Sequence, residues 1–447
     1  MTVTRTGYLV TGTHTELEKY KKELTVRPIV NSDFGSKPPS FKVFKPSKDG
    51  ICVPYHYGVT TFGAPKSDKR PDPKTYNIPF EGILRESVFQ PQAHQKALEA
   101  QRGVLSLPCG YGKTTVSLKI ASSLGYRTLI IVHKEFLASQ WRERIQQFCP
   151  GTTIGLIQQD KFDIEHPFVI AMLQTLSMKE FTFSDFETFG TVIVDEAHHI
   201  CAKVFSQALF KMCPKHLFGL SATPIRKDGL SCVLEWFMGP SFFSVDRENR
   251  GNVHVNVVRY SCDRYKECPP CNRMGKLSLV NMISELTEDE IRTSQIVKII
   301  KNLLKTKRHI IVLSERRNHC IYLKSQFVDE LSGLYMGGMK QKDLNESSNK
   351  KVIFATYSQA HEGLDIPTLD TLIMASPKSD IVQSIGRIMR ETEGKKNDPL
   401  IYDIVDEWSV LNAMYMKRRK VYKGINAYIE SVEEPESKQM AGFSFTF

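Results

Sequence analysis

The chain has 447 residues, of which 41% are hydrophobic and 24% charged, values that exclude a wholly disordered protein. No stretch approaches ~18 consecutive apolar residues, and the first residues lack the charged-then-apolar layout of a secretory signal. Lys and Arg number 60 against 49 Asp and Glu, so the formal net charge of +11 favours a polyanionic partner. Ten dispersed cysteines indicate reduced thiols. We therefore expect a soluble protein of an intracellular, reducing compartment, without membrane partners.

The first part of the chain differs in texture from the rest. Residues 1–80 contain repeated prolines and short apolar runs at 41–44 and 51–57, which predict a small β-rich N-terminal domain. Residues 65–79 are polar and proline-rich, as in a linker. From about residue 85, short β-branched runs alternate with amphipathic segments of helix length, which predicts βαβ units around parallel sheets.

The alternating elements form two series. The first is predicted to contain strands at 103–107, 128–132, 168–172, 191–194 and 217–221, with helices at 113–124 and 136–148. The second is predicted to contain strands at 309–313, 351–355 and 371–375, with helices at 291–304, 318–327 and 380–389. We therefore predict an α/β fold with two tandem lobes, residues 81–237 and 289–430, a connector at 238–288 and a tail at 431–447.

The strongest local motif is Leu107-Pro-Cys-Gly-Tyr-Gly-Lys-Thr114, between a predicted strand and a predicted helix. A glycine-containing turn at a helix N-terminus points backbone N–H groups at phosphates. Gly110 and Gly112 leave room for the phosphates, Lys113 reaches the β and γ phosphates, and the Thr114 hydroxyl binds Mg²⁺. The loop has Leu107 where the usual pattern has its first glycine. This segment predicts ATP and Mg²⁺ as cofactors.

A second motif, Thr191-Val-Ile-Val-Asp-Glu-Ala-His198, is an apolar strand that ends in two carboxylates. In a parallel sheet, such a strand end lies beside the phosphate loop. Asp195 would hold the Mg²⁺ shell and Glu196 would orient or deprotonate the attacking water. The alternative is an Asp-Glu helix cap after a core strand. Together, the two motifs predict an enzyme that hydrolyses a nucleoside triphosphate.

Further motifs resemble those of a known family. Asp195-Glu-Ala-His198, Ser221-Ala-Thr-Pro-Ile-Arg226, the segment 355–367 and Gln383-Ser-Ile-Gly-Arg-Ile-Met-Arg390 follow the order of the superfamily 2 helicases, in the DEAH form. The phosphate loop and Gly219-Leu-Ser-Ala-Thr-Pro224 look like the branch that moves along duplex DNA, which includes the nucleotide-excision-repair helicase. Segments 404–409 and 417–422 are similar to helicases of large DNA viruses. The resemblance implies two RecA-like lobes.

This resemblance also implies residue roles. Arg387 and Arg390 would act with Lys113, Asp195 and Glu196 in catalysis by contacting the γ-phosphate from the second lobe. The ATP-binding set is Gln95, Gly110, Tyr111, Gly112, Lys113, Thr114, Thr115, Asp195, Glu196, Gly363, Asp365, Gln383, Arg387 and Arg390. In the family an arginine precedes the adenine-reading glutamine; after Arg85 the chain offers Gln90, Gln92 and Gln95, and we choose Gln95 because Ala97-Leu98 follows it. His198, Ser221 and Thr223 would couple hydrolysis to movement.

Nucleic acid is expected at the strand ends of both lobes. Hydroxyls and basic groups there contact phosphates without reading bases. The candidates are His133, Lys134, Gln140, Thr175, Arg226, Ser314, Arg316 and Thr356. For each, the alternative is a loop polar group that faces solvent.

The sequence thus predicts an ATP-dependent helicase or translocase that acts on DNA, most simply duplex DNA, with single-stranded DNA or RNA open as substrates. Alternatives are an RNA-directed helicase, an NTPase that remodels a transcription complex, and the motor of a nuclease. Transcription or replication proteins are open as partners, and a viral protein would act in the host nucleus or a viral factory. Cys262, Cys268 and Cys271, with His254 as a distant fourth ligand, leave a zinc site open; the alternative is a proline-stiffened surface loop.

Overall fold

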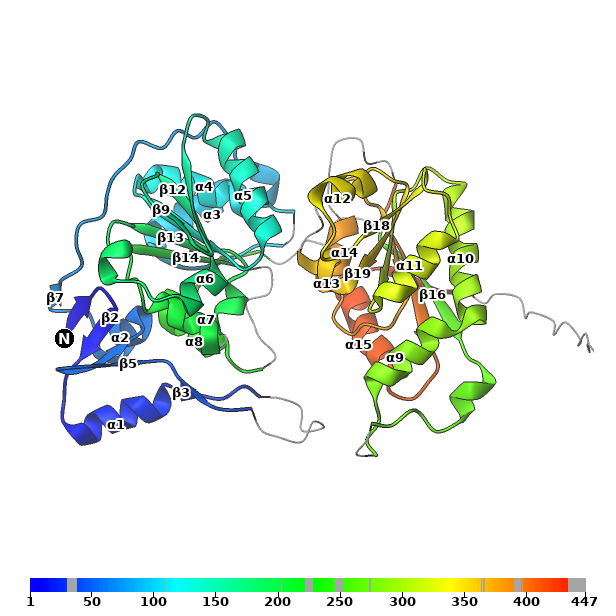
Figure 1. The fold of residues 1–447 in the computed structure, drawn as a ribbon, viewed down its shortest axis with the longest axis horizontal. Coiled ribbons are helices and arrows are strands. Elements are labelled where there is room, and N and C mark those ends of the chain that lie inside the picture. The colour runs from blue at the N-terminus through cyan, green and yellow to red at the C-terminus, as the bar shows by residue number, and fades with distance from the viewer. Residues whose placement is uncertain are drawn as a thin grey trace, which may run out of the picture. The chain divides into compact units, whose positions relative to one another are not determined.

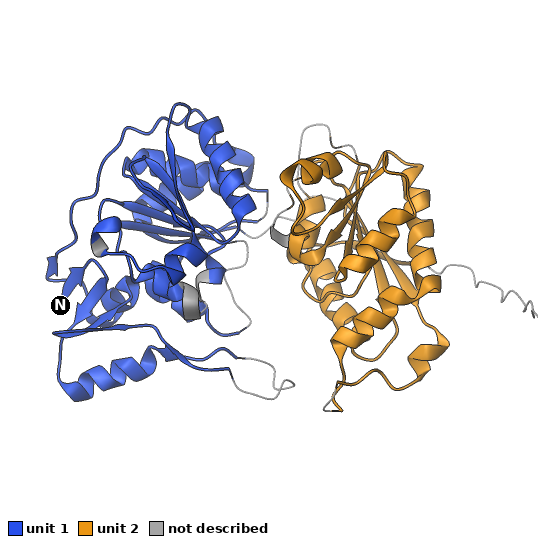
Figure 2. Cartoon of the chain, in the orientation of Figure 1, with its two compact units in different colours: residues 1–246 blue, residues 247–447 orange. Residues whose placement is uncertain are grey.

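The computed structural model describes two compact units of the chain, residues 1–246 and 247–447 (Figure 2). The described residues are 1–29, 38–108, 110–201, 203–221, 228–245, 252–272, 275–362, 364, 366–389, 395 and 397–432. Each unit is described by itself. Among these residues, no helix is both long enough and apolar enough to span a bilayer.

Unit 1 begins with a small mixed domain (Figure 1). Its sheet has the strand order β5-β6-β2-β1-β7, and β3 pairs separately with β4. The elements are β1 (Thr2–Thr4), β2 (Gly7–Val10), α1 (His14–Glu23), β3 (Thr25–Val26), β4 (Phe41–Lys42), β5 (Lys45–Ser47), β6 (Gly50–Val53), α2 (Tyr55–Phe62) and β7 (Ser67–Asp68). The predicted run at 51–57 thus divides into the end of a strand and the start of a helix.

The rest of unit 1 is built on one sheet, ordered β11-β10-β12-β9-β13-β14-β8-β15. All neighbouring strands are parallel except β10 and β11. The strands are β8 (Arg102–Ser106), β9 (Thr128–Val132), β10 (Ile154–Gln158), β11 (Lys161–Asp163), β12 (Phe168–Met172), β13 (Thr191–Val194), β14 (His216–Ser221) and β15 (Ser241–Ser244). The central strands are buried throughout and, apart from Thr128 and Thr191, apolar, because helices cover both faces of the sheet.

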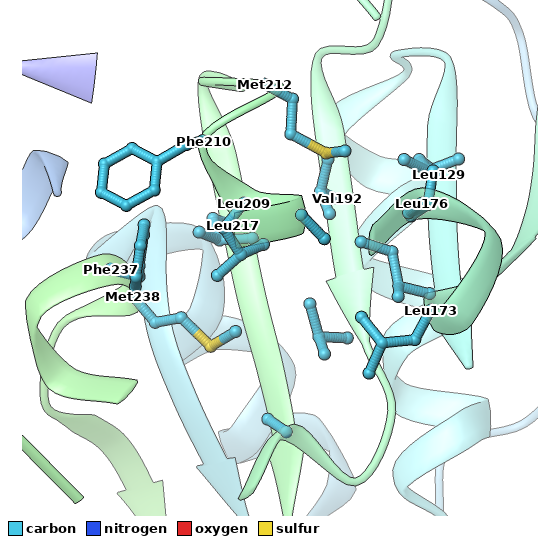
Figure 3. Packing of buried hydrophobic residues seen from close by; sticks show 14 of the residues in the cluster. Leu129, Leu173, Leu176, Val192, Leu209, Phe210, Met212, Leu217, Phe237 and Met238 are labelled. Carbon is cyan, nitrogen blue, oxygen red and sulfur yellow. The ribbon is translucent and has the colours of Figure 1, made fainter. Parts of the chain in front are cut away.

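The α-helices in the described part of this lobe pack on the two faces of the sheet. They are α3 (Gln90–Ala100), α4 (Lys113–Leu124), α5 (Glu135–Phe148), α6 (Leu173–Met178), α7 (Lys203–Leu209) and α8 (Ser231–Met238). Successive strand residues point to opposite faces, so Leu129 joins the cluster under α6 and α8 (Figure 3) while Ile130 joins the cluster under α4 and α5. The N-terminal domain packs on this lobe through α2 and α8, where the rings of Tyr57 and Trp236 lie 5.7 Å apart.

Unit 2 repeats this architecture. Its fully parallel sheet has the order β18-β19-β17-β20-β21-β16-β22. The strands are β16 (His254–Tyr260), β17 (Ile310–Ser314), β18 (Ser332–Tyr335), β19 (Val352–Thr356), β20 (Thr371–Met374), β21 (Leu400–Asp406) and β22 (Tyr428–Val432). The helices are α9 (Leu279–Glu288), α10 (Glu290–Leu304), α11 (Arg317–Ser325), α12 (Gln341–Ser348), α13 (Tyr357–Glu362), α14 (Val382–Ile388) and α15 (Val410–Gly424). Short 3-10 helices elsewhere occupy Glu86–Val88, Phe183–Asp185, Ala197–Cys201 and Asp263–Lys266. Two parallel-sheet lobes of this kind confirm the predicted α/β fold class.

The segment 238–288, predicted as a connector, is largely part of the two lobes. Its strand β15 pairs with β8 in the first sheet, and β16 lies between β21 and β22 in the second. The residues 431–432 of the predicted tail belong to β22. The sequence pattern of these two strands is weak, because β15 is a partly exposed edge strand and β16 carries polar residues between its buried valines.

A buried ion pair fixes α10 to the sheet of unit 2. Arg292 and Asp406 are both fully buried, with guanidinium–carboxylate distances of 2.6 and 2.9 Å, and Arg292 also donates to the Ala375 carbonyl at 2.8 Å. Removing one partner would leave the other as an uncompensated buried charge. We expect Arg292→Met to lower the free energy of unfolding of unit 2 by about 3–5 kcal/mol, measured by calorimetry.

The exposed pair of Arg264 with Glu285 provides the control for this prediction. Its atoms approach to 2.9 Å, but the arginine side chain is 56% exposed, so solvent screens the attraction. Arg264→Met should cost less than about 1 kcal/mol. Equal losses in the two variants would contradict a structural role for the buried pair.

Candidate functional site

The phosphate loop connects β8 to α4. Gly110 and Gly112 have φ values of 88° and 76°, in the left-handed region, and a Cβ added at Gly112 would lie 2.3 Å from the side-chain nitrogen of Gln90. Lys113 begins α4, and its Nζ donates to the Leu107 carbonyl at 3.0 Å. The Leu107 side chain is fully buried, which explains how the loop holds its turn with leucine at the first position. Cys109 lies outside the described residues.

Arg85 and Gln90 brace this loop from the start of α3. Gln90 is 1% exposed; its Oε1 accepts from the Arg85 backbone N–H at 2.8 Å, and its Nε2 donates to the Tyr111 carbonyl at 2.8 Å. The Arg85 guanidinium donates to the Gly110 carbonyl at 3.0 Å. The described part of the loop is therefore tied to α3 by side-chain hydrogen bonds before any ligand binds.

Gln90, rather than the predicted Gln95, is the glutamine that the structure places beside the phosphate loop. Gln95 is exposed on α3 and its amide donates to Glu99 at 3.3 Å. Five residues of helix turn the side chain by about 140°, which directs Gln95 away from the face that Gln90 occupies. Gln90 is thus the glutamine that contacts the loop, while the adenine-reading role of Gln95 stays a prediction. Arg85 followed five residues later by glutamine was the signal available in the sequence.

The two carboxylates follow β13. The indole N–H of Trp141 donates to Asp195 Oδ2 at 2.9 Å, and the Glu196 backbone N–H donates to Asp195 Oδ1 at 3.0 Å. Burial and the neighbouring Glu196 raise the pKa of Asp195, while Trp141 and Lys113 act in the opposite sense. Lys113 is thus close enough to Asp195 to influence its charge. No sequence motif links Trp141 to this carboxylate, because the two residues are 54 positions apart in the chain.

His198 lies between the carboxylates and β14. Its Nδ1 is 3.3 Å from Ser221 Oγ and 3.4 Å from Glu196 Oε2. Glu196 itself has a φ of 46°, an uncommon value for a residue other than glycine. The structure thus brings together Glu196, His198 and Ser221. Thr223, the third residue of the predicted coupling set, lies outside the described residues.

The remaining loop residues, Thr114 and Thr115, occupy the first turn of α4 and are partly buried, as is Tyr111. Thr114 thus follows Lys113 at the N-terminus of α4. No group of three or more His, Cys, Asp or Glu side chains is arranged to hold a metal within the described ranges. Cys268 and Cys271 are exposed free thiols and Cys262 is half-buried.

The predicted nucleic-acid segments of unit 1 meet at one sheet edge. Met172 and Val132 are register partners, so the residues that follow β12 and β9 are neighbours, and the Gln174 amide donates to the His133 carbonyl at 2.6 Å. Burial lowers the pKa of both His133 and Lys134. Gln140 is partly buried on α5, and Arg226 lies outside the described residues.

Three hydroxyls that were predicted to contact nucleic-acid phosphates are buried at the strand ends, and their contact with nucleic acid stays a prediction. Thr175, Ser314 and Thr356 are each at least nine-tenths buried. Thr175 accepts from the Gln159 backbone N–H at 3.1 Å, Ser314 lies 3.0 Å from His319 Nδ1, and Thr356 lies 3.3 Å from the Ser358 hydroxyl. These hydroxyls shape the strand ends instead of lying at the surface, because buried polar atoms require partners.

The other predicted residues of unit 2 lie at the ends of its strands and on α14. Arg316 donates to Ser284 Oγ at 3.2 Å and to the Val280 carbonyl at 2.6 Å, which ties it to α9. Arg387 Nε donates to the Ala360 carbonyl at 2.9 Å, and Gln383 is partly buried. Gly363, Asp365 and Arg390 lie outside the described residues.

A family described as "Type III restriction enzyme, res subunit" matches residues 84–226, which contain the phosphate loop and both carboxylates. The chain is 32% identical over 441 residues to the "Putative ATP-dependent RNA helicase L396" of Acanthamoeba polyphaga mimivirus, which covers 94% of this chain and 83% of that protein. The chain belongs to the superfamily 2 helicases.

Two further similarities agree with this assignment. The helicase is 27% identical over 361 residues to the "Putative ATP-dependent RNA helicase QP509L" of African swine fever virus, across 74% of this chain and 70% of that protein. The helicase domain of Hef from Pyrococcus furiosus has the same fold, with a TM-score of 0.51 at 17% identity over 76% of this chain and 100% of that one. The helicase is therefore a nucleic-acid-dependent ATPase with a nucleic acid as its substrate.

Proposed function

We propose that this helicase is a DEAH-type translocase that hydrolyses ATP, with Mg²⁺, to move along duplex DNA. The observation that carries the proposal is the chain of contacts from the two carboxylates to β14. Asp195 accepts from the Glu196 backbone, and His198 lies between Glu196 and Ser221. The charge of Lys113 in the phosphate loop also opposes the rise in the pKa of Asp195. A change at the phosphates can therefore reach the residues that follow Ser221.

The donor set of unit 1 suits Mg²⁺. Each Asp195 oxygen accepts one hydrogen bond and retains lone-pair capacity, and Glu196 Oε2 is buried without a hydrogen-bond donor among the described residues. Thr114 and Asp195 would hold the ion, which would neutralise phosphate charge. Asp195 must be ionised to bind it, and the burial that raises the pKa of Asp195 opposes this state in the absence of the ion.

The other residues of the proposed site have separate tasks. The N–H groups at Gly110, Tyr111 and Gly112 cradle the phosphates at the start of α4, and Lys113 leaves the Leu107 carbonyl to meet them. Glu196 orients the attacking water. For unit 2, we keep the proposal that Gln383, Arg387, Arg390, Gly363 and Asp365 contact ATP.

One observation supports DNA as the track, and another favours RNA. The phosphate loop and Gly219-Leu-Ser-Ala-Thr-Pro224 resemble the duplex-DNA branch that includes the nucleotide-excision-repair helicase. The net charge of +11 suits either polyanion. The printed names of the mimivirus and African swine fever virus relatives support an RNA-directed helicase as the second candidate. If the protein is viral, its proposed place of action is the host nucleus or a viral factory.

ATPase rates separate the candidates. We would measure the steady-state rate without nucleic acid and with duplex DNA, single-stranded DNA or single-stranded RNA. Strong stimulation by duplex DNA is expected. Stimulation by RNA alone would establish the second candidate, and no stimulation by any of them would favour remodelling of a protein complex.

The contacts of Gln90 predict a specific loss of ATP affinity. Gln90→Ala removes the hydrogen bond to the Tyr111 carbonyl of the phosphate loop and the one from the Arg85 backbone, and each such loss costs about 1–3 kcal/mol. We expect the KM for ATP to rise by about tenfold or more. Gln95→Ala is the matched control on the same helix and should leave the KM unchanged. The reverse pattern would return the assignment to Gln95.

A further inference from the structure

A cavity of about 340 Å³ lies in unit 2. Its walls come from α9, the start of α10, and α11, and include Thr293, Arg316, Asn318, His319 and Tyr322. Cavities that bind small ligands start at roughly 300 Å³. This cavity therefore has room for a small ligand of one or a few rings.

Two buried polar atoms in its walls lack partners. His319 is 3% exposed and Thr293 is 2% exposed, yet His319 Nε2 and Thr293 Oγ1 have no hydrogen-bond partner among the described residues. Burying a polar group without a partner is unfavourable, so natural proteins rarely do so. A ligand that occupies the cavity would supply the missing partners.

His319 is held on one side by Ser314. Ser314 Oγ accepts from the Arg316 backbone N–H at 3.2 Å and lies 3.0 Å from His319 Nδ1. Burial lowers the pKa of His319 to about 3, so the ring is neutral at physiological pH. The cavity wall thus presents an uncharged imidazole edge at Nε2.

The rim disfavours a phosphate and favours an aromatic ligand. Glu288 and Glu290 are exposed carboxylates at the lining, and they repel anions. The Arg316 guanidinium is already bonded to Ser284 and Val280. Tyr322 is 49% exposed, so its ring is available for stacking. A neutral, planar group with donors and acceptors along its edge matches these walls.

The cavity lies beside the end of β17. Arg316 follows this strand by two residues, and Ser314 is the register partner of Thr356 on β19. We propose that the cavity receives one unstacked nucleobase of the bound strand, stacked on Tyr322 and hydrogen-bonded to His319, Thr293 and Asn318. This rests on the proposed function only in requiring a nucleic-acid strand at this edge of the sheet. It adds that at least one base leaves the stack while the strand is bound.

An abasic scan tests the proposal with the full chain. A single-stranded DNA oligonucleotide would lose one base at a time, with its phosphates intact, and its affinity would be measured by fluorescence anisotropy. For the unmodified chain, removal of the base at one position should weaken binding about tenfold. Tyr322→Ala should bind the intact oligonucleotide about tenfold more weakly and should no longer respond to that position. Ile321→Ala, an equally exposed neighbour on α11 that does not line the cavity, should behave as the unmodified chain.

Each other outcome overturns the proposal in a distinct way. A scan with no sensitive position, or an unchanged response in Tyr322→Ala, would exclude base capture while leaving strand binding intact. Competition by free nucleosides together with a flat scan would assign the cavity to a free nucleoside. If the unmodified chain bound duplex DNA but none of the oligonucleotides, base capture would be excluded while the proposed function stood; if it bound neither, both would fail.

Discussion

Replacement of Lys113 by alanine should lower ATP turnover by about a hundredfold or more and leave nucleic-acid binding largely intact. Lys113 is the first residue of α4. Its ammonium lies 3.0 Å from the Leu107 carbonyl, and its charge opposes the rise in the pKa of Asp195. Without this charge, the β and γ phosphates lose the positive group that stabilises them during transfer. Steady-state hydrolysis and oligonucleotide anisotropy would measure the two properties separately.

Lys119→Ala is the matched control, since Lys119 lies later in α4 and its ammonium sits 5.3 Å from the Phe80 ring. This variant should retain normal turnover. Retained turnover in Lys113→Ala would show that the phosphate loop is not the site of hydrolysis. A parallel loss of oligonucleotide binding would instead indicate that Lys113 supports the fold of unit 1.

Glu196→Gln should lower kcat by about 10²–10⁴ and change the KM for ATP little. The substitution keeps the size of the side chain at a backbone φ of 46° but removes the group that would accept a proton from water. Glu196 also lies 3.4 Å from His198, which contacts Ser221. We therefore expect the variant to bind ATP but to lose the coupling between the nucleotide site and Ser221. Pre-steady-state hydrolysis and ATP binding would be measured together.

Glu143→Gln on α5 makes the same chemical change at an exposed position and should leave kcat unchanged. A normal kcat in Glu196→Gln would remove Glu196 from the reaction. A large rise in the KM with unchanged kcat would make it a residue that binds ATP and not one that assists transfer.

The central strands were predictable from the sequence for a physical reason. Buried parallel strands carry apolar side chains on both faces, so 128–132, 168–172 and 191–194 coincide with the observed strands β9, β12 and β13. Edge and alternating strands give weaker patterns. For this reason β10, β15, β16 and β22 were not predicted, and residues 238–288 were taken for a connector.

The site was predictable where chemistry and chain order coincide. Lys113, Asp195 and Glu196 follow from motifs that contain them, and the contact of His198 with Ser221 follows from the family resemblance. Partners distant in sequence did not follow. Trp141 on α5 orients Asp195 across 54 residues, and Gln90 differs from Gln95 only in the helix face that it occupies.

Burial also limits what a hydroxyl at a strand end can do. Ser314 was predicted to contact nucleic acid because polar groups at such ends often face ligands. In the structure its Oγ bridges the Arg316 backbone and His319 inside unit 2. The same Oγ lies against His319 in the wall of the cavity beside β17. Ser314, which was predicted at the surface, thus positions His319 and the Arg316 backbone inside unit 2.

A triplex-displacement assay tests the central claim most directly. A third strand would be annealed to a DNA duplex, and its release would be followed after addition of ATP, with Lys113→Ala as the blank. We expect the unmodified chain to release the third strand only when ATP is hydrolysed, because a motor that moves along the duplex must displace it. Hydrolysis stimulated by duplex DNA without any release would contradict movement along duplex DNA.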